Sequence, residues 1–146
     1  MLLLLACTAS TNHSDEIPAE IAVFQPTCGP ADGIALELLI GVETPGCGEA
    51  FTVAFTGEHY RLDFWESAYP PSATSYSFDQ SRGDGTGLWS EDTTETVSIT
   101  LVHGQVEISS QKDGIYRGTY VVQQEDEATR QGHFEAGTCD ASPICG

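Results

Sequence analysis

The sequence predicts an all-β fold, and three observations support this prediction. Apolar and polar residues alternate along most of the chain, which is the pattern of a strand with one buried face. Residues typical of turns separate the alternating runs at short intervals. No window of about 11 residues shows a helical apolar stripe. We therefore expect about eight strands in an antiparallel β-sandwich, with a small β-barrel as the alternative.

The first predicted strands follow a change of pattern at Ile21, where a polar stretch gives way to alternation. Apolar residues at every second position predict strands over residues 34–41 and 51–56. A further strand is expected over residues 60–64, after a turn at residues 57–59.

Residues 67–90 form the longest break in the strand pattern. Turn chemistry at residues 69–72 and 83–87 leaves room for only one short strand, near residues 76–78. Because loops on a rigid sheet often carry binding residues, we expect a functional loop here.

The last third of the chain predicts a four-strand meander. Alternation places its strands over residues 97–101, 106–108, 115–123 and 129–136. Turns are expected at His103-Gly104, at Lys112-Asp113-Gly114 and at Glu125-Asp126-Glu127.

The composition indicates one acidic domain. Of the 146 residues, 22 are acidic and 5 are basic, which gives a net charge of −17. Such a charge repels phosphate backbones, so we expect no nucleic-acid partner. Apolar and aromatic residues recur throughout residues 21–146, and this stretch is long enough to form a single domain with its own core.

The first residues carry a targeting motif. The apolar run Met1-Leu2-Leu3-Leu4-Leu5-Ala6-Cys7 ends abruptly at a polar stretch, and Leu4-Leu5-Ala6-Cys7 resembles the lipobox of bacterial lipoproteins. The resemblance implies that residues 1–6 are the remnant of a signal peptide, that Cys7 carries lipid, and that residues 7–20 are a flexible tether. The apolar part is short and lacks a basic flank, so we expect the true start upstream.

A second resemblance covers roughly residues 97–146. The runs Gly104-Gln-Val-Glu-Ile, Tyr116-Arg-Gly-Thr-Tyr-Val and Gly132-His-Phe-Glu-Ala are similar to the closing hairpins of uncharacterised exported β-rich lipoproteins, and Cys28-Gly-Pro-Ala-Asp-Gly is similar to an early motif of theirs. This resemblance implies a fold and a location, not a chemistry. Thr8 stands where Asp would mark inner-membrane retention, so the lipobox implies a cell-envelope protein anchored in the outer membrane.

Four further cysteines, Cys28, Cys47, Cys139 and Cys145, predict disulfides in an oxidising compartment. The strand expected between Cys28 and Cys47 separates its ends by roughly 25 Å, at about 3.3 Å per residue. We therefore favour two bridges that join the N-terminal pair to the C-terminal pair, and which partner each cysteine takes stays open. The spacings do not suit a four-cysteine zinc site.

Two sets of residues in or beside the irregular stretch are candidate binding residues. Asp79 and Asp84 offer carboxylate oxygens to Ca²⁺, although the spacing fails the calcium-loop motif. Trp65 and Trp89 offer rings for stacking on a glycan, or form a second core face instead. We expect no cofactor other than this possible Ca²⁺ and no other metal site.

No catalytic residues emerge from the sequence. Gly-x-Ser-x-Gly is absent, and an enzyme would need a cleft in which His59, His103 or His133 meets carboxylates. We therefore expect a non-enzymatic binding or envelope-structural module, attached to the membrane by its lipid, with an envelope protein or a glycan as partner. A barrel carrier of an apolar ligand and a periplasmic enzyme are the alternatives, and the oligomeric state stays open.

Overall fold

The structure, a computed structural model, describes residues 18–48 and 50–145. It consists of eight strands, one turn of 3-10 helix and their connections. The elements are β1 (Glu20–Cys28), β2 (Ile34–Val42), β3 (Phe55–Phe64), β4 (Ser75–Asp79), η1 (Gln80–Arg82), β5 (Gly85–Ser90), β6 (Ser98–Lys112), β7 (Ile115–Gln124) and β8 (Thr129–Thr138). Within the described ranges there is no α-helix, and no helix there is long and apolar enough to cross a membrane. Cys7 and most of the predicted tether lie outside these ranges, and β1 begins one residue before the predicted domain start.

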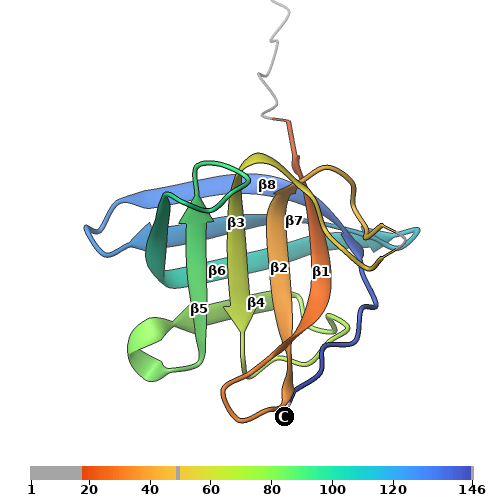
Figure 1. Ribbon diagram of the computed structural model, residues 1–146, viewed down its shortest axis with the longest axis horizontal. Helices are drawn as coiled ribbons and strands as arrows, with labels where there is room; N and C mark the ends of the chain where they lie inside the picture. The colour runs from red at the N-terminus through yellow and green to blue at the C-terminus, as the bar shows by residue number, and fades with distance from the viewer. Residues whose placement is uncertain (1–17, 49, 146) are drawn as a thin grey trace, which may run out of the picture.

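The strands close into a barrel of two layers. In Figure 1, β5, β3, β2 and β1 run side by side in front, and β6, β7 and β8 cross behind them at a steep angle. The layers join at both edges, because β5 pairs with β6 and β1 pairs with β8. The all-β prediction is therefore confirmed, and of the two predicted architectures the barrel is the one that forms. Alternation shows which residues face inward, but it does not show that the two sheet edges pair.

The pairing of β1 with β8 is parallel, which differs from the expected purely antiparallel sheet. Its register runs from Glu20 opposite Phe134 to Phe24 opposite Thr138. Every other strand pair is antiparallel among the described residues. The chain after β8 therefore continues in the direction of β1, and the amide of Cys139 donates to the carbonyl of Phe24 at 2.9 Å.

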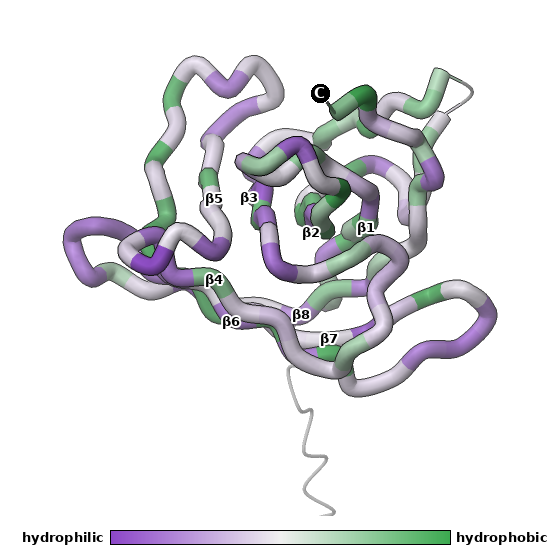
Figure 2. The backbone as a smooth tube through the Cα atoms, turned by 90° about the horizontal axis from the view of Figure 1, so that it is seen from below, coloured by the Kyte–Doolittle hydropathy of each residue, from purple (hydrophilic) through white to green (hydrophobic). Residues whose placement is uncertain are grey.

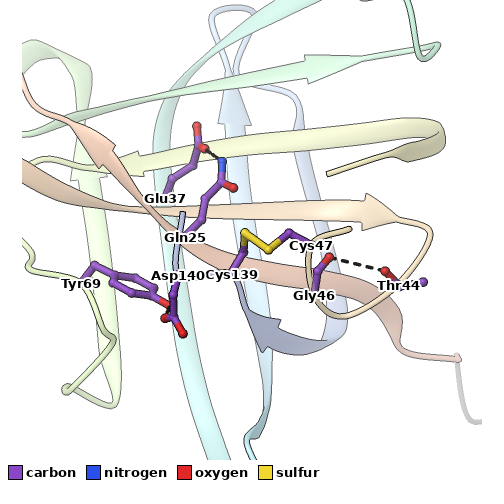
Figure 3. Close-up of a disulfide and its surroundings, with 8 residues drawn as sticks. All are labelled: Gln25, Glu37, Thr44, Gly46, Cys47, Tyr69, Cys139 and Asp140. Atoms are coloured by element: carbon purple, nitrogen blue, oxygen red, sulfur yellow. Dashed lines mark hydrogen bonds between the residues drawn. A yellow bond between two sulfur atoms is a disulfide. The ribbon is translucent and has the colours of Figure 1, made fainter. Parts of the chain in front are cut away.

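Two disulfides hold this continuation against the barrel. Cys47 joins Cys139 with their Cα atoms 5.3 Å apart (Figure 3), and Cys28 joins Cys145 with their Cα atoms 5.5 Å apart. Both link the N-terminal half to the C-terminal segment, as the sequence favoured. The chain-entropy model gives about 4–5 kcal/mol for each loop of this length.

Aromatic rings fill the barrel interior, and glycines on the neighbouring, paired strands make room for them. A Cβ on Gly104 would lie 2.8 Å from Cζ of Phe78, and one on Gly118 would lie 2.8 Å from Cζ of Phe134. The buried interior aromatic residues are Phe24, Tyr60, Phe64, Tyr76, Phe78, Trp89, Tyr116, Tyr120 and Phe134. Edge-to-face and tilted ring pairs connect many of them.

A second, smaller apolar cluster covers the outside of β1 and β2. It contains Val23, Leu39, Val42 and Cys139, with Val53 and Phe55 packed against it. β2 is therefore buried on both faces, which explains why its sequence is almost continuously apolar. Figure 2 shows the C-terminal segment, which ends at the mark C, lying outside the strands of this layer.

Several predicted turns are wrong because glycines were interpreted as chain reversals. The meander has three strands instead of four, since β6 runs without a break through His103-Gly104. β3 likewise runs through residues 57–59, whereas residues 51–54 lie outside any strand. The predicted loop over residues 67–90 contains β4 and β5, so only parts of it are irregular.

Replacing Gly104 by alanine should destabilise the fold by about 1–3 kcal/mol, because the added methyl group overlaps a core ring in a packed interior. Chemical denaturation of the variant and the wild type measures the loss. Gly57→Ala is the matched control, since nothing lies within 4 Å of a Cβ at that strand position. Equal stabilities for the two variants would contradict this account of Gly104.

Candidate functional site

A groove of about 590 Å³ opens where η1 meets the outer face of β6 and β7. Five of its six lining residues carry a polar group, while most of the exposed lining surface is apolar, and the six come from three separate parts of the chain. The lining residues are Asp79, Gln80, Ser81, Val102, His103 and Gln123. The groove therefore combines a carboxylate, an imidazole, two amides and a hydroxyl around one apolar residue.

A β-bulge in β6 builds the floor of the groove. Leu101 pairs with Gln124 and His103 pairs with Gln123, so Val102 is an extra residue without a partner on β7. Leu101 and Gly104 both face the interior, and the bulge leaves Val102 and His103 together on the outer face. The His103-Gly104 pair, predicted as a turn, instead turns the imidazole outward.

Strand register places the polar residues of the groove in one row. His103 lies opposite Asp79 of β4 on one side and opposite Gln123 of β7 on the other. Asp79 also caps η1, because its Oδ1 accepts from the amide of Ser81 at 3.0 Å and from the Ser81 hydroxyl at 2.6 Å. The hydrogen bonds from Ser81 hold the pKa of the Asp79 carboxyl below its usual value. The groove thus presents a fixed, ionised carboxylate beside a histidine.

The structure brings the two predicted calcium ligands, Asp79 and Asp84, together around the same turn. Asp84 Oδ1 accepts from the amide of Asp79 at 2.6 Å. Nε of Arg82 lies 3.7 Å from an oxygen of Asp79 and 3.8 Å from one of Asp84. The two carboxylates therefore accept hydrogen bonds within the turn and lie next to Arg82. The described residues contain no group of three or more His, Cys, Asp or Glu residues that could hold a metal ion.

The two predicted stacking residues do not form one platform. Trp89 belongs to the interior core cluster, and its indole also contacts two exposed side chains: Nε1 donates to Glu58 at 3.0 Å, and the Arg130 guanidinium lies 4.1 Å from a ring centroid. Trp65 follows the far end of β3 and is half-buried, and its amide donates to the carbonyl of Asp84. Trp89 belongs to the main core cluster and not to a second core face, and the Gly-x-Gly-x-Trp alternation in β5 was the signal for it.

Sequence reasoning missed a partly buried polar cluster on the outer face of β3. His59 is fully buried, stacks on Phe55 with ring centroids 3.6 Å apart, and lies 2.9 Å through Nε2 from Glu95. Arg61 donates to the same Glu95 oxygen at 2.6 Å. The bonds from Arg61 and His59 lower the pKa of the Glu95 carboxyl. No spacing in the sequence links residues this far apart.

This cluster contains a serine, a histidine and a glutamate, but its geometry does not suit nucleophilic catalysis. Ser90 is opposite His59 in the register of β3 and β5, and it is buried without a hydrogen-bond partner in the described part of the chain. Both ring nitrogens of His59 already face acceptors, the Gly57 carbonyl and the Glu95 carboxylate. Neither nitrogen is therefore available to take a proton from Ser90.

The remaining histidine considered, His133, lies on β8 opposite Thr119. Its neighbour Glu135 pairs with Arg117 at 2.9 Å on the exposed outer face. Glu135 therefore belongs to a surface ion pair with Arg117, and the structure does not bring His133 beside His59 or His103.

Replacing Glu95 by glutamine should lower stability at pH 7 by about 1 kcal/mol, because Arg61 and His59 lose a charged acceptor. The lowered pKa means that this stabilisation is present above the ordinary value of about 4 and is lost as pH falls below it. Urea unfolding at pH 7 and pH 3 should therefore show a larger deficit at pH 7 than at pH 3. Glu91→Gln, an exposed residue of the same loop, is the control, and an equal deficit there would contradict the role of Glu95.

Comparisons with protein-family models, with curated proteins and with solved structures found no match for this chain.

Proposed function

We propose that this protein is a non-enzymatic binding module of the bacterial cell envelope, held at a membrane by lipid on Cys7. The cysteines other than Cys7 lie in two disulfides, which supports an oxidising compartment outside the cytoplasm. The lipobox at residues 4–7 supports the anchor. The barrel interior, filled by its own aromatic rings, offers little support for a carrier of an apolar ligand.

The observation that carries the binding role is the bulge that turns His103 outward between Asp79 and Gln123. Side chains of this kind offer donors and acceptors in fixed directions, and sugar hydroxyl groups both donate and accept. The ionised Asp79 and the net charge of −17 repel anions. The ligand that fits best is therefore a neutral glycan, held mainly by hydrogen bonds.

The position of the groove suits a protein anchored through its N-terminus. β1 begins at one end of the barrel, and η1 lies near the opposite end (Figure 1). A barrel attached by residues before β1 would therefore have its point of attachment at the end opposite the groove, which leaves the groove accessible. A partner outside the membrane, such as an envelope glycan, would reach it there.

The anchor is tested by mass spectrometry of the mature protein from membrane fractions. We expect an N-terminus at Cys7 that carries fatty acyl chains, with everything before it removed. Cys7→Ser should leave the chain uncut and without acyl chains, because the variant lacks the thiol to which lipid attaches, so the lipidated N-terminus should be absent from the mass spectrum. Membrane-bound wild type with an unmodified Cys7 still joined to Ala6 would refute the anchor.

Glycan binding is tested by array screening and NMR titration of the soluble barrel domain with the strongest hit. Gln123→Ala and His103→Ala should each weaken binding about tenfold, since each removes a hydrogen bond worth about 1.4 kcal/mol. Gln131→Ala, an exposed amide on β8, should bind as the wild type does. Unchanged affinity in both groove variants would refute this site.

A further inference from the structure

Three polar residues form a row across the outer faces of β1, β2 and β3. Gln25 lies opposite Glu37, and Glu37 lies opposite Asp63. The side chain of Gln25 donates to Glu37 Oε1 at 2.5 Å, as the dashed line in Figure 3 shows. Directly opposite residues on antiparallel strands have Cβ atoms about 4.5–5.5 Å apart, so the two carboxyl groups are neighbours.

The hydrogen-bonding needs of these two carboxyl groups are not met when both are ionised. Glu37 is 7% exposed and Asp63 is half-buried. Oδ1 of Asp63 is buried and has no hydrogen-bond partner among the described residues. Two carboxylates side by side only accept, and each repels the other where water is scarce. One proton between them turns an acceptor into a donor and removes one charge.

We propose that Glu37 and Asp63 hold one shared proton at neutral pH, and that this proton-binding pair makes the stability of the barrel sensitive to pH. The inference is independent of the groove and of the membrane anchor. It assigns a role to two carboxyl groups that take no part in the proposed glycan site.

The charged group that faces the pair from β3 is Arg61. Its Nε already donates to Glu95, so Arg61 offsets only part of the repulsion between the two carboxyl groups. The C-terminal segment contributes a further charged group, Asp140, whose carboxylate is bonded to another residue: it accepts from the hydroxyl of Tyr69 at 2.5 Å. The remaining side chains that the register places around the pair on β1, β2 and β5 are uncharged: Gln25, Ala35, Leu39, Thr86 and Leu88.

The electrostatics agree with the geometry. Burial, followed by the neighbouring charge of Glu37, raises the pKa of Asp63 to about 8, and Arg61 lowers it in part. The folded protein therefore binds this proton more tightly than the unfolded chain, whose Asp value is about 4. Stability is greatest below that value, falls as pH rises from about 4 to about 8, and levels off above.

The test is the pH dependence of the unfolding free energy of the full chain between pH 5 and pH 9. Asp63→Asn keeps the shape of the side chain and removes its titration. Between pH 5 and pH 7, the unfolding free energy of the wild type should fall with pH more steeply than that of the variant. The difference in slope should correspond to about one proton released on unfolding, and the variant should be the more stable protein at pH 9. Glu37→Gln should reduce the slope similarly, because its amide can donate to Asp63.

Two further measurements make the result decisive. Glu135→Gln, which removes an exposed carboxylate, should keep the wild-type slope. Infrared spectra of the wild type at pH 7 should contain the carbonyl stretch of a protonated carboxylic acid, which disappears above pH 9, so the test stands even if a variant fails to fold. Parallel pH curves for wild type and Asp63→Asn, or the absence of that infrared band, would overturn the proposal.

Discussion

The parallel pairing of β1 with β8 is the constraint on which the rest of the structure depends. It joins the first described strand to the last and turns two sheet layers into a closed barrel without free edges between them. Because the two strands run in the same direction, the chain after β8 follows β1 toward Cys28. The disulfides then fix this segment at two points, Cys139 near the start and Cys145 at the end. Closure of a contact so far apart in sequence costs loop entropy, and the cross-links reduce that cost in the unfolded chain.

The outer face of β3 shows how two carboxyl groups acquire opposite shifts in pKa, Glu95 downward and Asp63 upward. Glu95 accepts from Arg61 and His59, so its ionised form is favoured and its pKa falls. Asp63 stands against Glu37 and is partly buried, so its neutral form is favoured and its pKa rises. The two groups weaken the fold at opposite ends of the pH range, one in acid and the other toward alkaline pH. The stability of this face should therefore peak in mildly acidic solution.

The sequence was sufficient for the all-β class, for the positions of β2, β7 and β8, and for the crossing disulfides. These depend on local alternation and on the reach of one strand, which are both visible in the residue order. It was not sufficient for the groove, because the bulge at Val102 depends on the register between β6 and β7. It also misplaced Gly104 in a turn, since a glycine that admits the Phe78 ring looks the same as one that reverses the chain. Asp79 was predicted only as a possible calcium ligand, and its neighbours His103 and Gln123 come from strands that only the folded barrel brings beside it.

The distribution of charge limits the classes of ligand that the groove would accept. Arg61, Arg82, Arg117 and Arg130 each lie within 4 Å of a carboxylate of the chain itself. Because five basic residues stand against 22 acidic ones, the surface field is negative, and among the described residues most carboxylates form no ion pair. An anionic ligand would meet that field everywhere and would find the ionised Asp79 in the groove. A divalent cation would find Asp79 and Asp84 already bonded within their turn and next to Arg82. A neutral ligand with many hydroxyl groups meets neither obstacle, and it can use the imidazole, the amides and the carboxylate of the groove at once.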